Sequence, residues 1–465
     1  MKKIILIAIL PITIMMAGSF VMTEGNPLIK ADTVSTSPTK PSSPTDTTTS
    51  NWTPKPLPTQ KFNVLDYGLK GDGVTDDSAA LKSLAKNSNV TNWYFPAGYR
   101  FNLSEVGVPA TVTSIHGGGT IHTLNPGSSG FGALKILGKI LIDGITFTVG
   151  SDFAGIRNYG MVTFMRSVGA GSDGSEIRNC TFDWEGNNGQ IDGIVFFVSD
   201  DSTAVQLKNL RIYNNDFLTI ATGDGFAIEG HDYGSRAGFI NVENMRIYNN
   251  NFNGTGNAIS TPQIRAPHYI YDNTFDGNNW AIELPECDKV EVYGNTFKNI
   301  TKNFIIEGVI WGNAHNQVLG TNKYYNNNFY GGAYLAFEPA GTRSEVYDNY
   351  IEGIIYVKRS SDIVADTGLG SIHDNIIVTK VNGPKNWVTA SIAYLGNLDN
   401  AQGSINNNDI YNVNPGKTGI VSGAGPNSIM SNNHIYTDGG KCINEGTQTG
   451  GSCDIQYTDT PPNKI

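Results

Sequence analysis

The sequence predicts an all-β protein whose main domain is a parallel β-helix, a solenoid in which every coil adds strands to stacked sheets. A short motif recurs through most of the chain at spacings typical of a solenoid, and no amphipathic stretch of helical length separates its copies. The composition agrees, because 54 Gly, 20 Phe and 21 Tyr accompany only 16% charged residues among 465. This balance excludes a coiled coil or a charge-rich helical bundle, and the aromatics exclude a wholly disordered chain.

The first 31 residues predict a signal peptide. Basic residues open the chain, and Ile4 to Met16 form an apolar run that is too short to span a bilayer comfortably. Ile29-Lys30-Ala31 ends in a small residue that suits cleavage, and an uncleaved N-terminal anchor is the alternative. We therefore expect a secreted protein with no membrane span after cleavage. The net charge of −10 argues against a nucleic-acid partner.

Residues 32–60 are mostly Thr, Ser and Pro, and such a segment cannot bury a core. They predict an extended, semi-rigid linker. The expected organisation is therefore a signal peptide over 1–31, a linker over 32–60 and a β-helix domain over 61–465.

The start of the β-helix domain differs from the rest. Ser78 to Lys86 predict a short helix that buries Leu81 and Leu84, with Thr75 or Asp76 as its N-cap. Trp93 to Gly98 follow as the first strand and turn.

The recurring motif reads apolar, any, any, Asn, any, large apolar. Its copies end 22 to 35 residues apart, at Phe147, Phe182, Phe217, Phe252, Phe275, Phe297, Phe329, Ile351, Ile377, Ile410 and Ile435. Such variable spacing with a constant strand predicts parallel strands about 4.8 Å apart, joined by loops of different length.

The Asn of the motif predicts an internal ladder of amides that hydrogen-bond from coil to coil, at a turn that needs a left-handed residue. The ladder residues are Asn215, Asn250, Asn273, Asn295, Asn327, Asn349, Asn375, Asn408 and Asn433, and Cys180 takes the equivalent position in its own coil. Cys180 and Cys287 are expected to be free. Cys442 and Cys453 lie close together in a Gly-rich tail. They can either form a local disulfide or remain as two free thiols.

The opening block and the coil motif together resemble the pectate-lyase-like and phage-tailspike-like superfamily. The resemblance covers nearly all of residues 61–465 and implies a single-stranded right-handed parallel β-helix with a short N-terminal capping helix. It also implies action on polysaccharide, without specifying the reaction.

A second strand follows each Asn motif, and these strands can be aligned. Ile228, Ile259, Ile282, Ile306, Phe337 and Val357 form an apolar column that should point inward. Alternation then places a polar column outside, made of Glu229, Ser260, Glu283, Glu307, Glu338 and Lys358.

Carboxylates one strand apart repel each other, which raises the pKa of one of them, as a general acid requires. We expect Glu229, Glu283 and Glu307 to be catalytic. The small residues Ala227, Ala258, Ala281 and Ala336 should leave a groove beside them, in which substrate would be bound by Glu338, Tyr334, Tyr356, Lys358 and Trp184. The alternative is a solvated acidic face, with or without bound Ca²⁺.

Asp192-Gly193-Ile194 and Thr222 to Ile228 are similar to two segments of the polygalacturonase-type glycoside hydrolases. This resemblance implies that Asp192 and Asp224 are catalytic aspartates, although Gly223 stands where the family has a third. The alternative is that both are turn aspartates before Gly. His231 is a further candidate for proton transfer, or a solvated loop residue.

These features favour a secreted enzyme that hydrolyses extracellular polysaccharide through paired carboxyl groups. Carboxylates one or two coils apart would be separated by about 4.8 or 9.6 Å, which spans the retaining and inverting ranges. The alternatives are a polysaccharide lyase or uronate epimerase of the same fold, and a non-catalytic glycan-binding adhesin or tailspike-like protein. Hydrolysis requires no cofactor, and bound Ca²⁺ is an alternative. The protein is expected to be a monomer or a homotrimer.

Overall fold

The computed structural model of the chain divides into two units, Met1–Thr47 and Thr48–Ile465, and all described residues belong to the second. They are residues 52–124, 132–150, 153, 160–165, 173–186, 191–198, 207–220, 225–232, 242–262, 264, 266–284, 287, 289–300, 305–307, 321–330, 335–338, 344–358, 368–380, 390–398, 402–424, 429–444 and 448–456. For residues 197–198, 231–232, 307, 335–338, 356–358, 368–369, 393–398, 402 and 421–424 only the backbone is described. The predicted signal peptide and residues 32–51 of the predicted linker lie outside these ranges.

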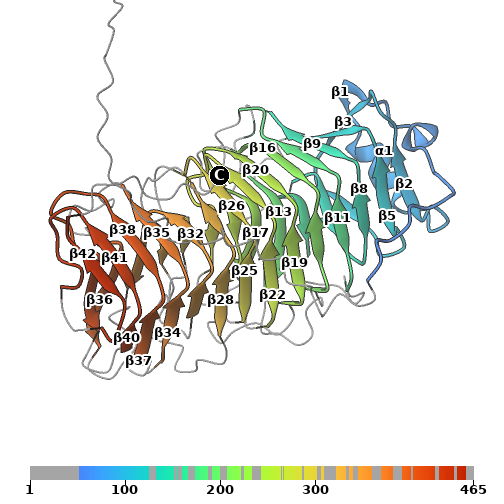
Figure 1. Ribbon diagram of the computed structural model, residues 1–465. Helices are drawn as coiled ribbons and strands as arrows, with labels where there is room; N and C mark the ends of the chain where they lie inside the picture. Colours follow the sequence, from blue (N-terminus) through green and yellow to red (C-terminus); the bar gives the residue numbers. More distant parts are fainter. Residues whose placement is uncertain are drawn as a thin grey trace, which may run out of the picture. The chain divides into compact units, whose positions relative to one another are not determined.

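The second unit is a right-handed parallel β-helix, as predicted. Successive coils add one strand in turn to each of three parallel sheets, which are called A, B and C here. Figure 1 shows the strands of neighbouring coils side by side along the solenoid.

Sheet A contains thirteen strands within the described residues. In spatial order they are β2 (Asn92–Phe95), β5 (Ser114–Gly117), β8 (Leu141–Asp143), β11 (Glu176–Arg178), β15 (Arg211–Tyr213), β19 (Met245–Tyr248), β22 (His268–Tyr271), β25 (Val290–Tyr293), β28 (Asn322–Tyr325), β31 (Ser344–Tyr347), β34 (Gly368–His373), β37 (Gln402–Asn406) and β40 (Ile429–Ser431).

Sheet B follows sheet A in each coil and has fifteen described strands. They are β1 (Asp72–Asp76), β3 (Arg100–Leu103), β6 (Thr120–Thr123), β9 (Thr146–Val149), β12 (Thr181–Asp183), β16 (Asp216–Ile220), β20 (Asn251–Gly254), β23 (Thr274–Asp276), β26 (Thr296–Lys298), β29 (Asn328–Phe329), β32 (Tyr350–Glu352), β35 (Ile376–Thr379), β38 (Asp409–Asn412), β41 (His434–Thr437) and β42 (Ser452–Asp454).

Sheet C completes each coil with twelve described strands. They are β4 (Val106–Val108), β7 (Leu134–Ile136), β10 (Gly160–Phe164), β13 (Asp192–Val198), β17 (Phe226–Asp232), β21 (Asn257–Ser260), β24 (Ile282–Glu283), β27 (Ile306–Glu307), β30 (Leu335–Glu338), β33 (Ile354–Lys358), β36 (Ile392–Leu398) and β39 (Ile420–Ala424). A separate pair is formed by β14 (Leu207–Lys208) and β18 (Val242–Glu243).

The predicted capping helix is α1 (Ser78–Leu84), preceded by the 3-10 helix η1 (Val64–Tyr67). Its N-cap is Asp77, so the prediction of Thr75 or Asp76 is wrong by one or two residues. The Asp77 carboxylate is already used elsewhere, because it accepts hydrogen bonds from the backbone N–H groups of Lys70 and Gly71. Leu81 and Leu84 are buried as expected.

The predicted asparagine ladder is confirmed. In the coil of Asn273, for example, its Oδ1 accepts from both the backbone N and the Nδ2 of Asn250, each at 3.0 Å. Cys180 starts the ladder by donating its N–H to Asn215, and Gln448 ends it by pairing with Asn433. The residue before every ladder position has a left-handed φ between 52° and 66°, as the turn requires.

The large apolar residue of the motif builds the core against this ladder. The rings of Phe147, Phe182, Phe217, Phe252, Phe275, Phe297 and Phe329 stack with centroids 4.6 to 4.9 Å apart. This spacing is close to the separation of neighbouring strands, so one ring occupies each coil.

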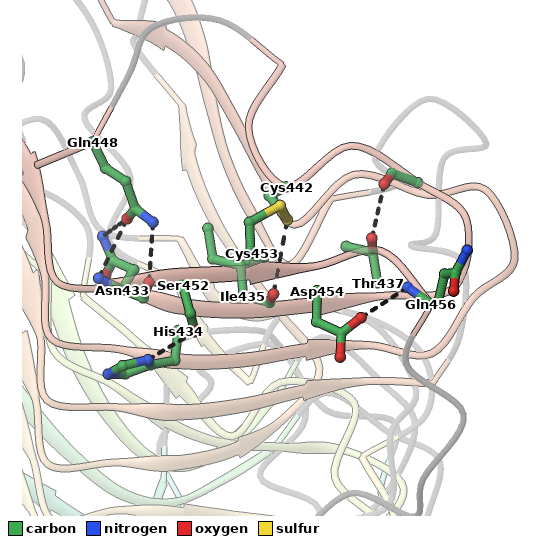
Figure 2. Close-up of a disulfide and its surroundings, with 11 residues drawn as sticks. Asn433, His434, Ile435, Thr437, Cys442, Gln448, Ser452, Cys453, Asp454 and Gln456 are labelled. Carbon is green, nitrogen blue, oxygen red and sulfur yellow. Dashed lines mark hydrogen bonds between the residues drawn. A yellow bond between two sulfur atoms is a disulfide. The ribbon is translucent and has the colours of Figure 1, made fainter. Parts of the chain in front are cut away.

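The C-terminal coil is closed by a disulfide between Cys442 and Cys453, which resolves the open alternative in favour of the bridge. Figure 2 shows the bridge beside the Asn433–Gln448 pair at the end of the ladder. Cys180 and Cys287 are free and buried, as predicted.

The folded domain begins earlier than predicted. Trp52 packs edge-on against Tyr213, with ring centroids 5.7 Å apart, and the backbone of Lys55 hydrogen-bonds to Glu176 and Arg178. Trp52 and Lys55 therefore contact sheet A, although both belong to the segment 32–60 that was predicted to be an extended, semi-rigid linker.

Candidate functional site

The outward column of sheet C is the candidate site. Strand register places Glu229, Ser260, Glu283, Glu307 and Glu338 in successive coils, which we call the carboxylate strip. The residue before each pairs in the same way, and Ile194, Ile228, Ile259, Ile282 and Ile306 are all at most 1% exposed. The predicted alignment of these coils is therefore confirmed.

The first three members of the strip differ in their surroundings. Glu229 is 8% exposed and Ser260 is 4% exposed, whereas Glu283 is only partly buried. The Ser260 hydroxyl donates to Glu283 Oε2 at 2.8 Å. The buried carboxyl group of Glu229 thus lies two coils from the carboxylate of Glu283, which has a hydroxyl donor.

The predicted end of the strip is wrong. A register shift in β30 pairs Phe337 with Ile355, which continues the inward column in place of Val357. Tyr356 follows Ile355 and so takes the position expected for Lys358, which lies two residues further along β33. By backbone register, the strip therefore continues from Glu338 to Tyr356.

The groove predicted beside the strip is not formed by the small residues proposed for it. Ala227, Ala258 and Ala281 are completely buried and belong to the hydrophobic core. The side chain of Ala336 lies outside the described set.

Trp184 does not flank the site. Its side chain is 1% exposed within the core, its Nε1 donates to the carbonyl of Ile191 at 2.9 Å, and a Cβ on Gly193 would come within 3.0 Å of the ring. The prediction of substrate contact is wrong, because alternation from Phe182 turns this residue inward.

Asp192 occupies a structural position. It is 1% exposed, and its Oδ1 accepts from the backbone N of Phe226 in the next coil at 2.6 Å. Alternation along β13 places it on the face of Ile194, opposite the face that continues into Glu229. This burial and this bond contradict the expected role of Asp192 as a catalytic group.

The other predicted residues are only partly described. Asp224 and Tyr334 lie outside the described residues. His231, in β17, and Glu307, Glu338, Tyr356 and Lys358 are placed by their backbone alone. Among the residues that the structure describes, no group of three or more His, Cys, Asp or Glu could hold a metal ion.

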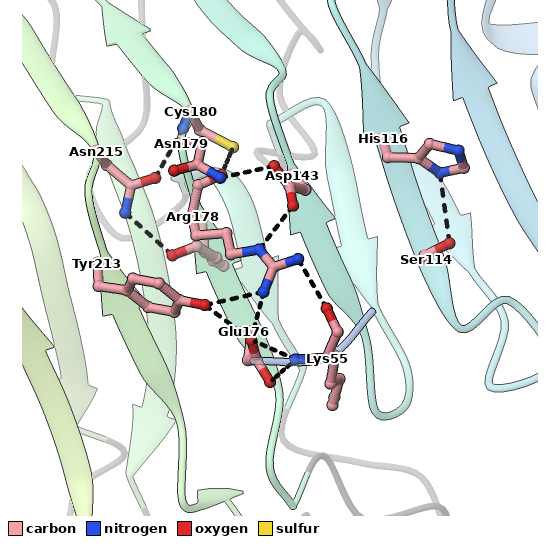
Figure 3. Close-up of polar contacts among 11 residues, drawn as sticks. Lys55, Ser114, His116, Asp143, Glu176, Arg178, Asn179, Cys180, Tyr213 and Asn215 are labelled. Carbon is pink, nitrogen blue, oxygen red and sulfur yellow. Dashed lines mark hydrogen bonds and ion pairs between the residues drawn. The ribbon is translucent and has the colours of Figure 1, made fainter. Parts of the chain in front are cut away.

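A polar cluster on the outer face of sheet A was missed by the sequence reasoning. Arg178 donates from Nε to Asp143 at 2.6 Å and from Nη1 to Glu176 and to the Tyr213 hydroxyl (Figure 3). Asp143 also accepts from Asn179 at 2.9 Å. The signal in the sequence is the set of charged residues beside the inward isoleucines, such as Glu176 and Arg178 on either side of Ile177.

The fold and the carboxylate strip define a parallel β-helix protein with an acidic strip on one sheet. Residues 61–305 match the family described as rhamnogalacturonase A/epimerase, pectate lyase-like. This match covers more than half of the chain, and the protein belongs to this family. No curated protein sequence matches the chain.

Solved structures with low sequence identity share the fold. PfbA, a surface adhesin of Streptococcus pneumoniae, has a TM-score of 0.51 and 17% identity, over 83% of this chain and 91% of that chain. The N-terminal fragment of bacteriophage Phi29 gene product 12 has a TM-score of 0.55 and 16% identity, over 82% of this chain and 68% of that chain. The A-module of the Azotobacter vinelandii mannuronan C-5 epimerase AlgE4 has a TM-score of 0.50 and 15% identity, over 86% of this chain and 100% of that chain. Within the described residues, no helix is long and apolar enough to cross a membrane.

Proposed function

We propose that the protein is exported and hydrolyses an extracellular polysaccharide at the carboxylate strip of sheet C. The observation that carries the proposal is the contrast between Glu229 and Glu283 on either side of Ser260. Membership of the pectate lyase-like family supports a polysaccharide as the substrate class.

The two carboxyl groups suit different roles. A buried environment disfavours the charged form of a carboxyl group, so Glu229 is suited to hold the proton that the glycosidic oxygen receives. The hydroxyl of Ser260 stabilises a charged carboxylate on Glu283, which is suited to activate water.

The spacing supports hydrolysis with inversion. Glu229 and Glu283 are two coils apart, which corresponds to about 9.6 Å of strand spacing. Inverting glycosidases need a wide separation because a water molecule must fit between the second carboxylate and the sugar. Glu307 lies one coil beyond Glu283 and would face the next part of the glycan chain.

A panel of neutral and acidic polysaccharides, with and without Ca²⁺, tests this function. We expect new reducing ends without the ultraviolet absorbance of an unsaturated product, and loss of turnover in Glu283→Gln. Absorbance together with reducing ends would establish a lyase, a change in uronate configuration without cleavage an epimerase, and binding without any chemical change an adhesin. Each of these results would refute the hydrolase.

A further inference from the structure

The outer face of sheet A carries residues 52–61, which we call the N-terminal strap. It extends from Trp52, beside Tyr213 of β15, to Lys61, whose Nζ lies 4.8 Å from the ring centre of Tyr94 in β2. Midway, Lys55 donates its backbone N–H to Glu176 at 3.3 Å and accepts from Arg178 Nη2 at 2.7 Å. Figure 3 shows this backbone contact beside the polar cluster.

The acidic groups beneath the strap are occupied by one arginine. Asp143 accepts from Arg178, and Glu176 accepts from Arg178, from the Tyr213 hydroxyl at 3.1 Å and from Lys55. These bonds direct both carboxylates toward Arg178. Glu176 is also the strand-register neighbour of the next arginine along the sheet, where its charge acts without a direct ion pair.

That next arginine is Arg211, which is 7% exposed. Its guanidinium carbon lies 4.3 Å from the ring centre of Trp52, and its buried Nε has no hydrogen-bond partner. Among the residues described by the structure, no acceptor or carboxylate is within hydrogen-bonding or ion-pairing distance of Arg211. Contact with Trp52 uses the face of the guanidinium and leaves the N–H groups in its plane to donate elsewhere.

A second arginine reinforces the positive charge. Arg246 pairs with Arg211 in strand register, is 2% exposed, and lies 4.5 Å from the ring centre of Tyr269. Burial, together with the charge of Arg246, lowers the pKa of Arg211. Arg246 also donates from Nη2 to Asn244 Oδ1 at 3.2 Å. The buried charge of Arg211, reinforced by this second guanidinium, favours binding of an anion, because a buried charge is stabilised when it is paired.

We propose that Arg211 and Arg246, covered by Trp52, form an oxyanion-binding site that takes the carboxylate of an acidic sugar or a free inorganic oxyanion. Arginine binds such groups in a planar, bidentate manner. The aromatic rings of Trp52 and Tyr269 suit the apolar face of a sugar. Because this site lies on sheet A and the carboxylate strip lies on sheet C, the proposal is independent of the proposed hydrolysis.

The test is a thermal unfolding titration of the full chain at constant ionic strength. Sodium sulfate, trigalacturonic acid and neutral maltotriose are added separately to the wild type, Arg211→Met and Lys323→Met. The last variant is the matched control, because Lys323 lies in the same outward column of sheet A, in β28.

We expect the wild-type unfolding midpoint to rise with sulfate or trigalacturonic acid in a saturable manner, and not with maltotriose. Arg211→Met should weaken this response at least about tenfold, and Lys323→Met should retain it. Without anion, the midpoint of Arg211→Met should be no lower than that of the wild type, because an unpaired buried charge has been removed.

A response to sulfate alone identifies a free oxyanion as the ligand, and a response to trigalacturonic acid alone identifies an acidic glycan; both support the site. No saturable response in the wild type, or an equal response in Arg211→Met, would overturn it. If Arg211→Met does not fold by circular dichroism, Trp52→Ala decides, since it leaves sheet A intact and should weaken anion binding several-fold.

Discussion

Replacing Asn273 by alanine removes one rung of the asparagine ladder. The Asn273 side chain accepts two hydrogen bonds from Asn250 and donates to the Ile247 carbonyl at 2.9 Å and to Asn295 Oδ1 at 3.1 Å. The residue is 1% exposed, so water cannot replace these partners. At about 1 kcal/mol for each of the lost bonds, with an added cost for the buried groups left unpaired, the free energy of unfolding should fall by about 4–6 kcal/mol.

Urea unfolding followed by circular dichroism measures this loss. The matched control is Asn253→Ala, an exposed asparagine of the preceding coil, which should change the free energy of unfolding by less than about 0.5 kcal/mol. Hydrogen exchange should localise the effect, because the coils of a solenoid are coupled mainly to their neighbours. An Asn273→Ala protein as stable as the control would refute the idea that the ladder holds the coils together.

Three further predictions concern stability. His268 is fully buried, and burial lowers its pKa to about 4, so the folded state stays unprotonated while the unfolded state binds a proton below about pH 6.5. Stability should therefore fall by up to about 3 kcal/mol as the pH drops from 6.5 to 4, and His268→Phe should reduce this fall; an unchanged acid profile would contradict the assignment. Replacing Cys442 and Cys453 by serine removes a disulfide between residues 11 apart in sequence and should destabilise the last coil by about 2–3 kcal/mol. The loss should appear as faster hydrogen exchange of β41 and β42, and unaltered exchange would show that the disulfide does not stabilise this coil. Trp184→Ala should lower the free energy of unfolding by about 3–5 kcal/mol, and a loss of glycan affinity at unchanged stability would restore the groove role that its burial excludes.

The coil motif made most of the fold predictable. Its Asn has a fixed place relative to the turn, so the ladder and the place of Cys180 followed from spacing alone. The same alternation aligned Glu229 with Glu283 across the intervening coil.

Other features depend on geometry that spacing does not carry. The observed pairing of β30 with β33 differs by two residues from the predicted alignment and includes a bulge, so Lys358 lies outside the strip. Trp184 turns inward after β12, although its amphipathic side chain suited a groove wall equally well. The docking of the strap was not predicted, because a Pro-rich composition suits an extended linker as well as a segment that packs on a sheet.

The central claim is tested most directly by the products that wild type and Glu283→Gln release from the polysaccharide that the panel identifies. The account predicts that wild type generates reducing ends without unsaturated products, and that Glu283→Gln generates none while its unfolding midpoint stays within a few degrees of the wild type. Substantial turnover by a folded Glu283→Gln protein, or by a folded Glu229→Gln protein, would contradict hydrolysis at the carboxylate strip.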